Sequence, residues 1–582
     1  MVQALHEAGI GVIMDVVYNH VADAGQFCFN QIVPGYFSRV HDDGSYQSNS
    51  GCGNDTASER SMVSKYIVDS VLYWCEEYHI DGFRWDLVGL IDYETINAVM
   101  EAVHEVNPDI IFYGEGWEMC SWTTKDEGEY ASDPYSKKMT IQNNDKLVNT
   151  EAGTFAFFND TIRNVIHGGV FTATDKGFVC GNLSYSTKQT VIDGYMAYSV
   201  WGSAGERVDT PVQTINYASC HDNYTLFDNF TVDAVDLKGE TLSAETAAAA
   251  AEQAVAYNNL AAAYYITAQG VPFIHAGEEM LRSKPSVDAE NNFVFDHNSY
   301  SSGDGVNSFK WGELTNGLKM DSYNYYKGLI AFRKAHPALR MTDQAEILEA
   351  MSSWDTGNSD VIAILNEGGN GEDNAILSIF NTSTSDVTVK LPAGRQWYVY
   401  VNGNQAGTKV LAIAYDELTV PATSAVIMVE APLPVIASGW SGYTTWTLDV
   451  MGTLTVSPTE ESFNGETNMK NYWKVNGVLT LPWGLYADMI TKVVVEDGVH
   501  DLGQMAFYEL PNLTTVVLGE SVTEIRNYTF KNCVSLTPIN LEGVTNICEG
   551  AFYGCSALTD VTLNDAVTIG DWAFSKSGYQ PN

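Results

Sequence analysis

Four short segments of the sequence place a carboxylate or an imidazole inside or just after an apolar run. They cover residues 15–20, 81–87, 113–117 and 218–223. Carboxylates and imidazoles are the side chains that most often act as nucleophiles, general acids and general bases. A single Asp after a strand is more often a helix N-cap than a catalyst. Four such segments in order are harder to explain by capping, so together they indicate a catalytic site.

The elements that must position these segments alternate between strand and helix over about the first 340 residues. A short apolar run covers residues 11–17, helical patterns cover 61–78 and 244–268, and a further run covers 270–275. Strands that alternate with helices predict βα units and a parallel sheet. Polar residues that cluster where parallel strands end form the active site of a (β/α)8 barrel. The polar residues at predicted strand ends are Asn19, His20, Asp86, Glu115, His221 and Asp222.

The pattern changes after the helical and strand alternation. From about residue 345 to 430, short alternating apolar segments are separated by Gly, Asn, Ser and Thr, which predicts an antiparallel β-sandwich. Its first strand is expected at Ile347 and Leu348. Proline and Gly/Ser-containing sequence then predicts a linker. The expected domains are 1–340 (barrel), 341–432 (β-sandwich), 433–445 (linker) and 446–582 (repeat).

The C-terminal region repeats with a period of 22 to 23 residues. This period lies in the leucine-rich-repeat range, where stacked units bury one apolar column. The repeat resembles the BspA-type leucine-rich repeats of bacterial surface proteins. Adhesion or attachment to substrate and an inert spacer both stay open, because a solenoid fold does not specify a ligand. The repeating positions are Phe507, Phe530, Phe552 and Phe574; Leu513, Leu536 and Leu558; Leu518, Leu541 and Leu563; and Ile525, Ile547 and Ile569.

Charge and composition narrow the class of partner. The net charge of −43 disfavours nucleic acid and anionic membrane surfaces. No apolar run reaches about 18 residues, so no transmembrane helix is expected. Aromatic residues make up 12%, which suits either core packing or stacking on sugars. The nine cysteines form no Cys-x-x-Cys pair, so neither a zinc site nor a dense disulfide framework is expected.

The four segments resemble the four sequence regions of the α-amylase family of glycoside hydrolases in order, spacing and flanks. The resemblance covers about residues 1–430. It implies that Asp86 is the nucleophile, Glu115 the general acid/base and Asp222 the carboxylate that stabilises the transition state. It also implies that Arg84 holds Asp86 in its ionised form. The further residues expected to bind substrate are Tyr18, His20, Trp117, His221 and Asn223.

The chemistry of this family requires such residue types. Hydrolysis with retention of configuration needs one attacking carboxylate and one proton-donating carboxylic acid about 5–5.5 Å apart. A neighbouring Arg lowers the pKa of the attacking group. A less solvated site keeps the acid protonated. No cofactor is required; a structural calcium is common in the family, but its ligands are not placed here.

Within the family, the flanking residues resemble type I pullulanases more than plain amylases. The resemblance implies hydrolysis of α-1,6-glucosidic linkages in pullulan, amylopectin or glycogen-type glucans. Trp85 stands where pullulanases usually have Phe, and the Tyr-Asn-Trp-Gly-Tyr-Asp-Pro motif of pullulanases is absent. An α-1,4-acting or dual-specificity amylopullulanase therefore stays open, as does a surface adhesion protein with an inactive catalytic remnant. The pullulanase-like segments are 51–60, 83–87, 114–117, 157–160, 221–228 and 275–279.

The extent and location of the chain follow from the same resemblance. The first region lies at the third strand of the family barrel, so residues 1–340 are expected to supply the third to eighth strands of an incomplete TIM barrel. We expect the chain to be truncated at both ends, which would account for the lack of a signal peptide at Met1. An extracellular or cell-surface bacterial location is expected, with an α-glucan as substrate and contact to a cell surface or host through the repeat.

Overall fold

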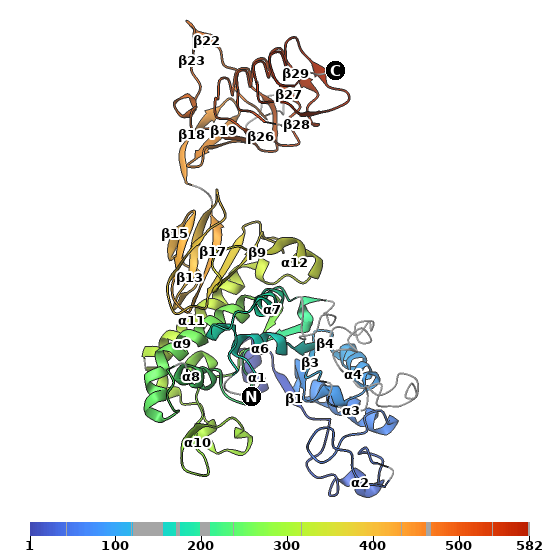
Figure 1. The fold of residues 1–582 in the computed structure, drawn as a ribbon. Helices are drawn as coiled ribbons and strands as arrows, with labels where there is room; N and C mark the ends of the chain where they lie inside the picture. The colour runs from blue at the N-terminus through green and yellow to red at the C-terminus, as the bar shows by residue number, and fades with distance from the viewer. Residues whose placement is uncertain are drawn as a thin grey trace. The chain divides into compact units, whose positions relative to one another are not determined.

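The computed structural model consists of two compact units (Figure 1). One contains Met1–Ala393 and Trp397–Glu430, and the other contains Gly394–Gln396 and Ala431–Asn582. Among the described residues, no helix is both long and apolar enough to span a membrane. The described residues are 1–41, 43–117, 119, 155–169, 175–197, 210–236, 238–315, 317–431, 434–460, 467–537 and 539–579.

A six-stranded parallel sheet organises the first unit, and its strands follow one another in chain order. Val16 pairs with Trp85, and Trp85 pairs with Gly114, so the residues that follow these three strands emerge at one edge of the sheet. This edge is where the predicted site residues should meet. The strands are β1 (Ile13–Val16), β2 (Gly82–Trp85), β3 (Ile111–Gly114), β4 (Phe155–Phe158), β5 (Thr214–Asn216) and β6 (Val271–Pro272).

In the described part of the chain, helices lie between β1 and β2, between β2 and β3, between β4 and β5, and between β5 and β6. The helix predicted at 61–78 is present as α3 (Ser61–Tyr78), and its buried residues recur every four positions from Val63 to Cys75. They pack against α4 (Tyr93–Val106), which begins at the N-cap Asp92. The other helices are α1 (Val2–Glu7), α2 (Cys28–Ile32), α6 (Asp160–His167), α7 (Tyr185–Tyr195), α8 (Leu226–Asp236), α9 (Ala244–Thr267), α10 (Asp304–Asn307), α11 (Gly317–Ala335) and α12 (Gln344–Ala350).

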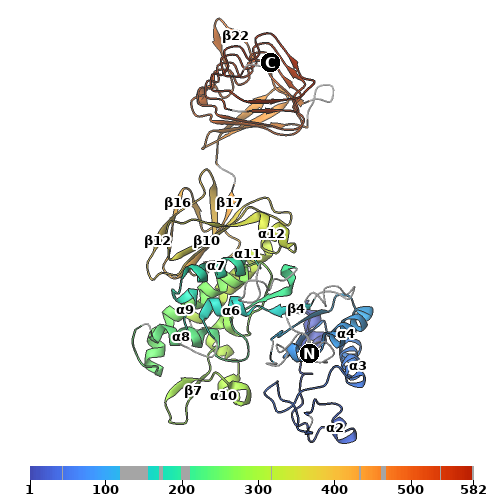
Figure 2. The same ribbon diagram turned by 45° about the vertical axis from the view of Figure 1, so that its right-hand side comes forward.

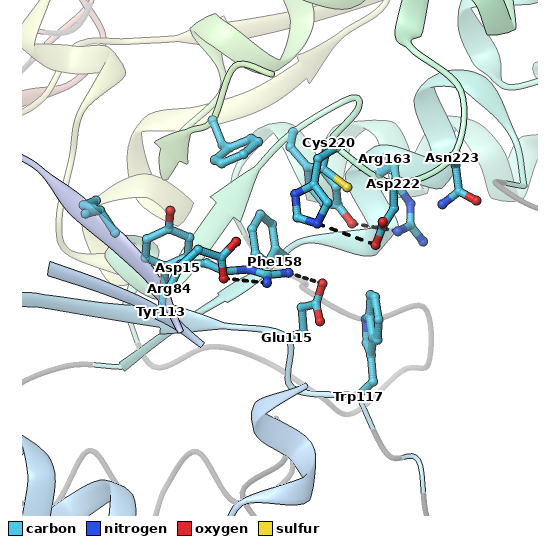
Figure 3. A pocket seen from close by; sticks show the side chains of 14 residues that line it. Asp15, Arg84, Tyr113, Glu115, Trp117, Phe158, Arg163, Cys220, Asp222 and Asn223 are labelled. Atoms are coloured by element: carbon cyan, nitrogen blue, oxygen red, sulfur yellow. Dashed lines mark hydrogen bonds and ion pairs between the residues drawn. The ribbon is translucent and has the colours of Figure 1, made fainter. Parts of the chain in front are cut away.

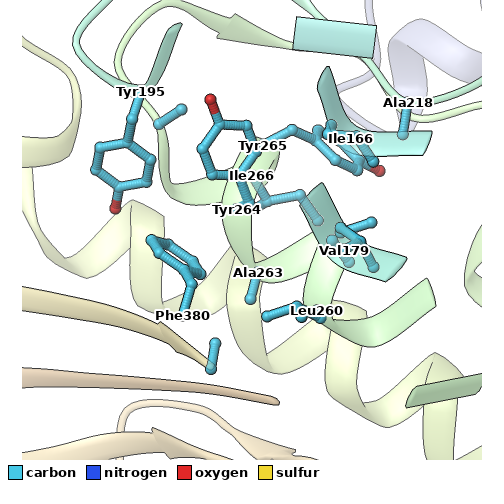
Figure 4. Close-up of a cluster of buried hydrophobic side chains, with 14 of the residues drawn as sticks. Ile166, Val179, Tyr195, Ala218, Leu260, Ala263, Tyr264, Tyr265, Ile266 and Phe380 are labelled. Atoms are coloured by element: carbon cyan, nitrogen blue, oxygen red, sulfur yellow. The ribbon is translucent and has the colours of Figure 1, made fainter. Parts of the chain in front are cut away.

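The long helix α9 occupies the centre of the largest apolar core (Figure 4). Its C-terminal half is buried on all sides, from Tyr257 to Thr267. The ring of Tyr264 lies 5.6 Å from that of Phe380, which belongs to the antiparallel strand β11 (Ile376–Asn381). The parallel sheet region and the antiparallel strands of the first unit therefore share a core.

Antiparallel pairing in the first unit gives one seven-stranded sheet and two two-stranded sheets, one of which pairs β7 (Pro285–Val287) with β8 (Phe293–Phe295). Ile347 and Leu348, predicted as a strand, lie instead in helix α12. That prediction was wrong because Asp343 caps the helix by accepting a hydrogen bond from the Ala345 N–H (2.7 Å), and only Ile347 is buried. The strands are β9 (Met351–Trp354), β10 (Val361–Asn366), β11, β12 (Val387–Lys390), β13 (Gln396–Asn402), β14 (Gln405–Ala406), β15 (Ala412–Ala414), β16 (Glu417–Val420) and β17 (Ser424–Ala431).

The predicted linker at 433–445 is not a linker over its described residues. It forms β18 (Val435–Ser441), which pairs antiparallel with β19 (Thr444–Asp449). Gly439 suggested flexibility, but its missing side chain makes room for a ring: a Cβ there would lie 2.8 Å from Nε1 of the buried Trp446. The small residues of this stretch thus serve packing.

The second unit stacks short strands in register (Figure 2). Ile525 pairs with Ile547, and Ile547 with Ile569, each one repeat further along. Neighbouring rings of the four repeating phenylalanines stack at 5.2–5.3 Å. The strands are β20 (Thr453–Pro458), β21 (Thr467–Asn468), β22 (Lys474–Val475), β23 (Val478–Leu479), β24 (Lys492–Val495), β25 (Val499–Leu502), β26 (Thr515–Leu518), β27 (Glu524–Ile525), β28 (Ile539–Leu541), β29 (Asn546–Ile547), β30 (Val561–Leu563) and β31 (Thr568–Ile569).

Candidate active site

Arg84 is the centre of the site, because its guanidinium contacts three carboxylates. It donates to Asp15 Oδ1 at 2.8 Å and to Asp86 Oδ1 at 2.9 Å, and it also forms an ion pair with Glu115. Its side chain is only 7% exposed. Burial alone would lower the pKa of Arg84, but Glu115, Asp15 and Asp86 raise it, so the group stays charged.

Glu115 follows β3 and has a side chain that is 6% exposed. Its Oε2 accepts a hydrogen bond from the Leu87 N–H at 3.0 Å. Burial raises the pKa of Glu115 to about 7, and Asp86 and Asp222 add to this rise, while Arg84 and the Leu87 N–H oppose it. Because burial outweighs the ion pair, a large fraction of Glu115 carries a proton near neutral pH, as a general acid requires.

Asp86 is held by a second residue besides Arg84. The fully buried Asn19 donates from Nδ2 to Asp86 Oδ2 at 3.0 Å and to the Asp86 carbonyl at 2.7 Å. With Arg84 on Oδ1 and Asn19 on Oδ2, both oxygens of the carboxylate accept hydrogen bonds, which fix the orientation of the side chain. Asn19 was expected at a strand end but was given no role; its place between Tyr18 and His20 was the available signal.

A pocket joins these strand ends to the loop that follows β5 (Figure 3). Of the predicted site residues, it brings together Arg84, Glu115, Trp117 and the three consecutive residues from His221 to Asn223. The side chains of His221 and Asp222 are 56% and 59% exposed, and His221 Nε2 lies 3.7 Å from Asp222 Oδ2. The remaining lining residues are Ile13, Asp15, Tyr113, Phe158, Arg163, Tyr217, Cys220 and Phe273.

Three predicted residues lie outside the lining of this pocket. Asp86 is joined to it through Arg84. His20 contacts Asn19, which in turn contacts Asp86: His20 Nδ1 lies 2.6 Å from Asn19 Oδ1. Tyr18 packs its ring against Trp85 at 5.4 Å and shares a hydrogen bond with Ser70. In this structure Tyr18 and His20 support the strand ends from outside the pocket lining.

The sequence analysis missed a second polar cluster that borders the pocket. Asp160 accepts hydrogen bonds from Trp117 Nε1 at 2.9 Å and from the Tyr217 hydroxyl at 2.5 Å. Arg163 contacts Asp160 at 3.2 Å and donates to the Tyr217 hydroxyl at 2.7 Å. The segment 157–160 was noted only for its likeness to pullulanases, and nothing in it revealed that Asp160 orients Trp117.

The arrangement can perform acid/base and nucleophilic chemistry with side chains alone. It combines a buried acid and a more exposed carboxylate in the pocket lining, Glu115 and Asp222, with a third carboxylate, Asp86, that Arg84 joins to them. Within the described ranges, no group of three or more His, Cys, Asp and Glu side chains is arranged to hold a metal ion. The geometry therefore assigns no ligands to the expected structural calcium.

Comparisons with known proteins relate both units to characterised families. Residues 485–580 match the family described as "BspA type Leucine rich repeat region (6 copies)". The chain is 36% identical to the pullulanase of Bacillus subtilis over 347 residues, which are 60% of this chain and 43% of that protein. The chain thus spans less than half of that relative's length.

Solved structures agree with this likeness. The type I pullulanase of Bacillus subtilis complexed with maltose matches with a TM-score of 0.63 and 31% identity, over 74% of this chain and 55% of that one. The pullulanase of Paenibacillus barengoltzii complexed with maltohexaose and α-cyclodextrin matches with a TM-score of 0.62 and 33% identity, over 74% and 60% of the two chains. The chain is therefore similar to type I pullulanases and carries a BspA-type repeat at its C-terminus.

Proposed function

We propose that the protein hydrolyses α-1,6-glucosidic branch linkages in α-glucans and retains the configuration of the anomeric carbon. The observation that carries this proposal is the buried guanidinium of Arg84, which contacts both Asp86 and Glu115. One cation thereby positions a nucleophile and an acid beside each other. Similarity to pullulanases and to an isoamylase favours the α-1,6 linkage over the α-1,4-acting and dual-specificity alternatives.

In the proposed first step, Asp86 attacks the anomeric carbon while protonated Glu115 gives its proton to the departing glycosidic oxygen. The bond to the leaving sugar breaks as the bond to Asp86 forms, which leaves a covalent glycosyl ester and an ionised Glu115. Glu115 then removes a proton from water, which displaces Asp86 and regenerates both groups. Asp222 stabilises the positive charge that develops on the sugar ring in each step.

The proposed contacts to the sugar come from the pocket lining. Trp117 offers a flat ring whose orientation Asp160 fixes, and His221 and Asn223 offer polar atoms to hydroxyl groups. A neutral glucan is compatible with the net charge of −43. The pullulanases solved with maltose and with maltohexaose support an α-glucan as the ligand class. The proposed reaction uses side chains and water and needs no cofactor.

We also propose that the parallel sheet represents six strands of an eight-stranded barrel. Two findings support this: the six strands are parallel and in chain order, and the similar structures are pullulanases.

For the repeat, we propose an extracellular or cell-surface setting, supported by its match to a BspA-type family. Contact with a host or with substrate through the repeat extends this proposal.

The products of pullulan digestion test the linkage. Pullulan joins maltotriose units through α-1,6 bonds, so the proposed activity releases maltotriose. The matched control is Asp86→Asn, which keeps the shape of the side chain but removes its charge. Release of a trisaccharide that still contains an α-1,6 bond would show cleavage of α-1,4 bonds and would overturn the proposed specificity. No release by the wild-type protein would overturn the activity itself.

A further inference from the structure

The loop that carries Asp222 presents an exposed acid from a short irregular segment. Residues 219–225 follow β5, and Asp222 and Asn223 both line the pocket (Figure 3). Asn223 has a φ of +62°, in the left-handed region. A displacement of about 1 Å can cost about 10²-fold in rate, so a reacting carboxylate on such a loop requires support from behind.

Lys284 supplies a contact on both sides of Asp222. Only 2% of this lysine is exposed. Its Nζ donates to the carbonyl of His221 at 3.2 Å and to the carbonyl of Asn223 at 3.5 Å. These two carbonyls flank Asp222 in the chain. Hydrogen bonds from an ammonium group are stronger than neutral ones, so a single side chain restrains the backbone at the residue before Asp222 and at the residue after it.

The backbone of Lys284 is itself fixed by a buried acid in α8. The Lys284 N–H donates to Asp228 Oδ2 at 2.8 Å, and the Ser283 hydroxyl donates to Asp228 Oδ1 at 2.5 Å. Asp228 is fully buried. The backbone from which the Lys284 side chain extends to the loop is therefore held in place by Asp228.

The start of the same loop has a separate anchor. The Ser219 hydroxyl donates to Glu278 Oε2 at 2.7 Å, and Glu278 Oε1 accepts from the hydroxyls of Tyr265 at 2.5 Å and Tyr326 at 2.9 Å. Glu278 and Lys284 lie six residues apart in one segment. That segment thus contacts the loop at Ser219 and on both sides of Asp222.

We propose that Lys284 is a positioning residue for Asp222: its ammonium holds the carbonyls of His221 and Asn223, the residues on either side of Asp222, so that the carboxylate faces the reacting sugar. This inference rests on the proposed glycoside hydrolysis. Burial and the nearby Arg282 lower the pKa of Lys284, whereas Asp228, Asp296 and Asp222 raise it. The net effect lowers the pKa of Lys284, and Asp222 opposes this loss of charge without reversing it.

The test compares Lys284→Met, Asp222→Asn and the double variant on pullulan. Methionine keeps the length of the side chain and removes its donors. We expect Lys284→Met to lower kcat about 10²-fold and to change KM by a smaller factor, because Trp117 and the other lining residues outside the loop keep their contacts to the glucan. The double variant should be no slower than Asp222→Asn alone, because Lys284 acts through Asp222. Lys284→Arg keeps charge and donors and should recover part of the loss.

Controls separate this role from general packing and from the proposed function. Lys65→Met removes an exposed lysine paired with Asp69 and should leave kcat unchanged. If Lys284→Met does not fold, Lys284→Gln replaces it in the same comparison. A kcat within about twofold of wild type, or rate losses that multiply fully in the double variant, would overturn the role of Lys284. A wild-type protein that does not cleave pullulan would instead overturn the proposed function.

Discussion

The strand-end pocket and the phenylalanine column are both buried, but they bury opposite kinds of side chain. In the pocket, the side chains of Arg84 and Glu115 are 7% and 6% exposed and form an ion pair. In the column, Phe530 and Phe552 have no exposed surface, and their rings stack at 5.3 Å with an interplanar angle of 11°.

The charged side chains of the pocket serve the proposed reaction, whereas the apolar rings of the column serve the stability of the second unit. Buried charges are costly unless they are paired, and removing one partner leaves the other uncompensated. A stack of similar apolar layers gains from each layer it adds and needs no single partner. We expect isosteric substitutions in the pocket to abolish chemistry at modest cost to folding, because they keep the shape of the side chain. Truncations in the column should do the reverse, because they leave a cavity in a different unit from the reacting groups.

The largest effect should come from Asp86→Asn. The amide keeps the size of the side chain and can accept from Arg84 or from Asn19 but not from both, and it cannot form the glycosyl ester. We expect kcat on pullulan to fall about 10⁴-fold or more, with little change in the temperature of unfolding. Steady-state kinetics and thermal melts measure both. A loss below about tenfold would show that Asp86 is not the nucleophile.

Glu115→Gln should be severe but dependent on the substrate. Loss of the general acid should lower the rate about 10²–10⁴-fold for a sugar leaving group, which needs a proton. Cleavage of an aryl glucoside with a good leaving group should suffer less, because that group departs without protonation. Rates on both substrates are compared in the same variant. Equal losses on the two would remove Glu115 from the role of acid.

Phe530→Ala tests the other half of the comparison. The ring stacks between Phe507 and Phe552, so its removal leaves a cavity in the column. We expect the free energy of unfolding of the second unit to fall by about 3–5 kcal/mol. Hydrolysis of pullulan should stay within about twofold, because the reacting residues lie in the first unit. Denaturant unfolding measures the loss of stability, and kinetics on the same sample measure hydrolysis. Unchanged stability of Phe530→Ala would contradict the stacked column.

Glu278 gives a smaller, pH-dependent effect in the first unit. Burial raises its pKa to about 7, against hydrogen bonds from Tyr265, Ser219 and Tyr326 that lower it. Folding therefore takes up a proton between the unfolded pKa and about 7, so this contribution to stability is full in acid and lost as pH rises through about 7. Glu278→Gln should flatten the decline between pH 5 and 8 by up to about 3 kcal/mol. If the free energy of unfolding declines equally with pH in the wild type and in Glu278→Gln, the raised pKa of Glu278 is contradicted.

The smallest effect concerns the alkaline side of the activity profile. The pKa of Glu115 is raised to about 7, and the proposed reaction needs its protonated form. We expect kcat/KM to fall as pH rises through about 7, approaching tenfold per pH unit above it. Initial rates between pH 5 and 9 test this. A profile that stays flat to pH 9 would mean that Glu115 keeps its proton for another reason or is not the acid.

The parts of the molecule that produce a periodic spacing of apolar residues could be predicted from the sequence. The period of about 22 residues placed Phe530 and Phe552 in one column, and the helical pattern at 61–78 matched α3 to the residue. The carboxylates after β2 and β3 could be placed because strand ends of a parallel sheet meet at one edge.

Contacts between distant segments could not be predicted in this way. Nothing local in Lys284 or Asp160 shows that one reaches the loop of Asp222 and the other orients Trp117. The strand β18 was missed because Gly439 indicates flexibility unless the ring of Trp446 that fills its space is known. These residues depend on tertiary packing, which periodicity and propensity do not encode.

The most direct test of the account is the configuration of the product that the protein releases from pullulan, followed by NMR during the first minutes of hydrolysis. Attack by Asp86 and displacement by water are two inversions, so the account predicts that the new reducing end appears first as the α-anomer. Asp86→Asn should release no product on the same timescale. A new reducing end that appears first as the β-anomer would contradict a covalent intermediate on Asp86 and with it the assignment of the site.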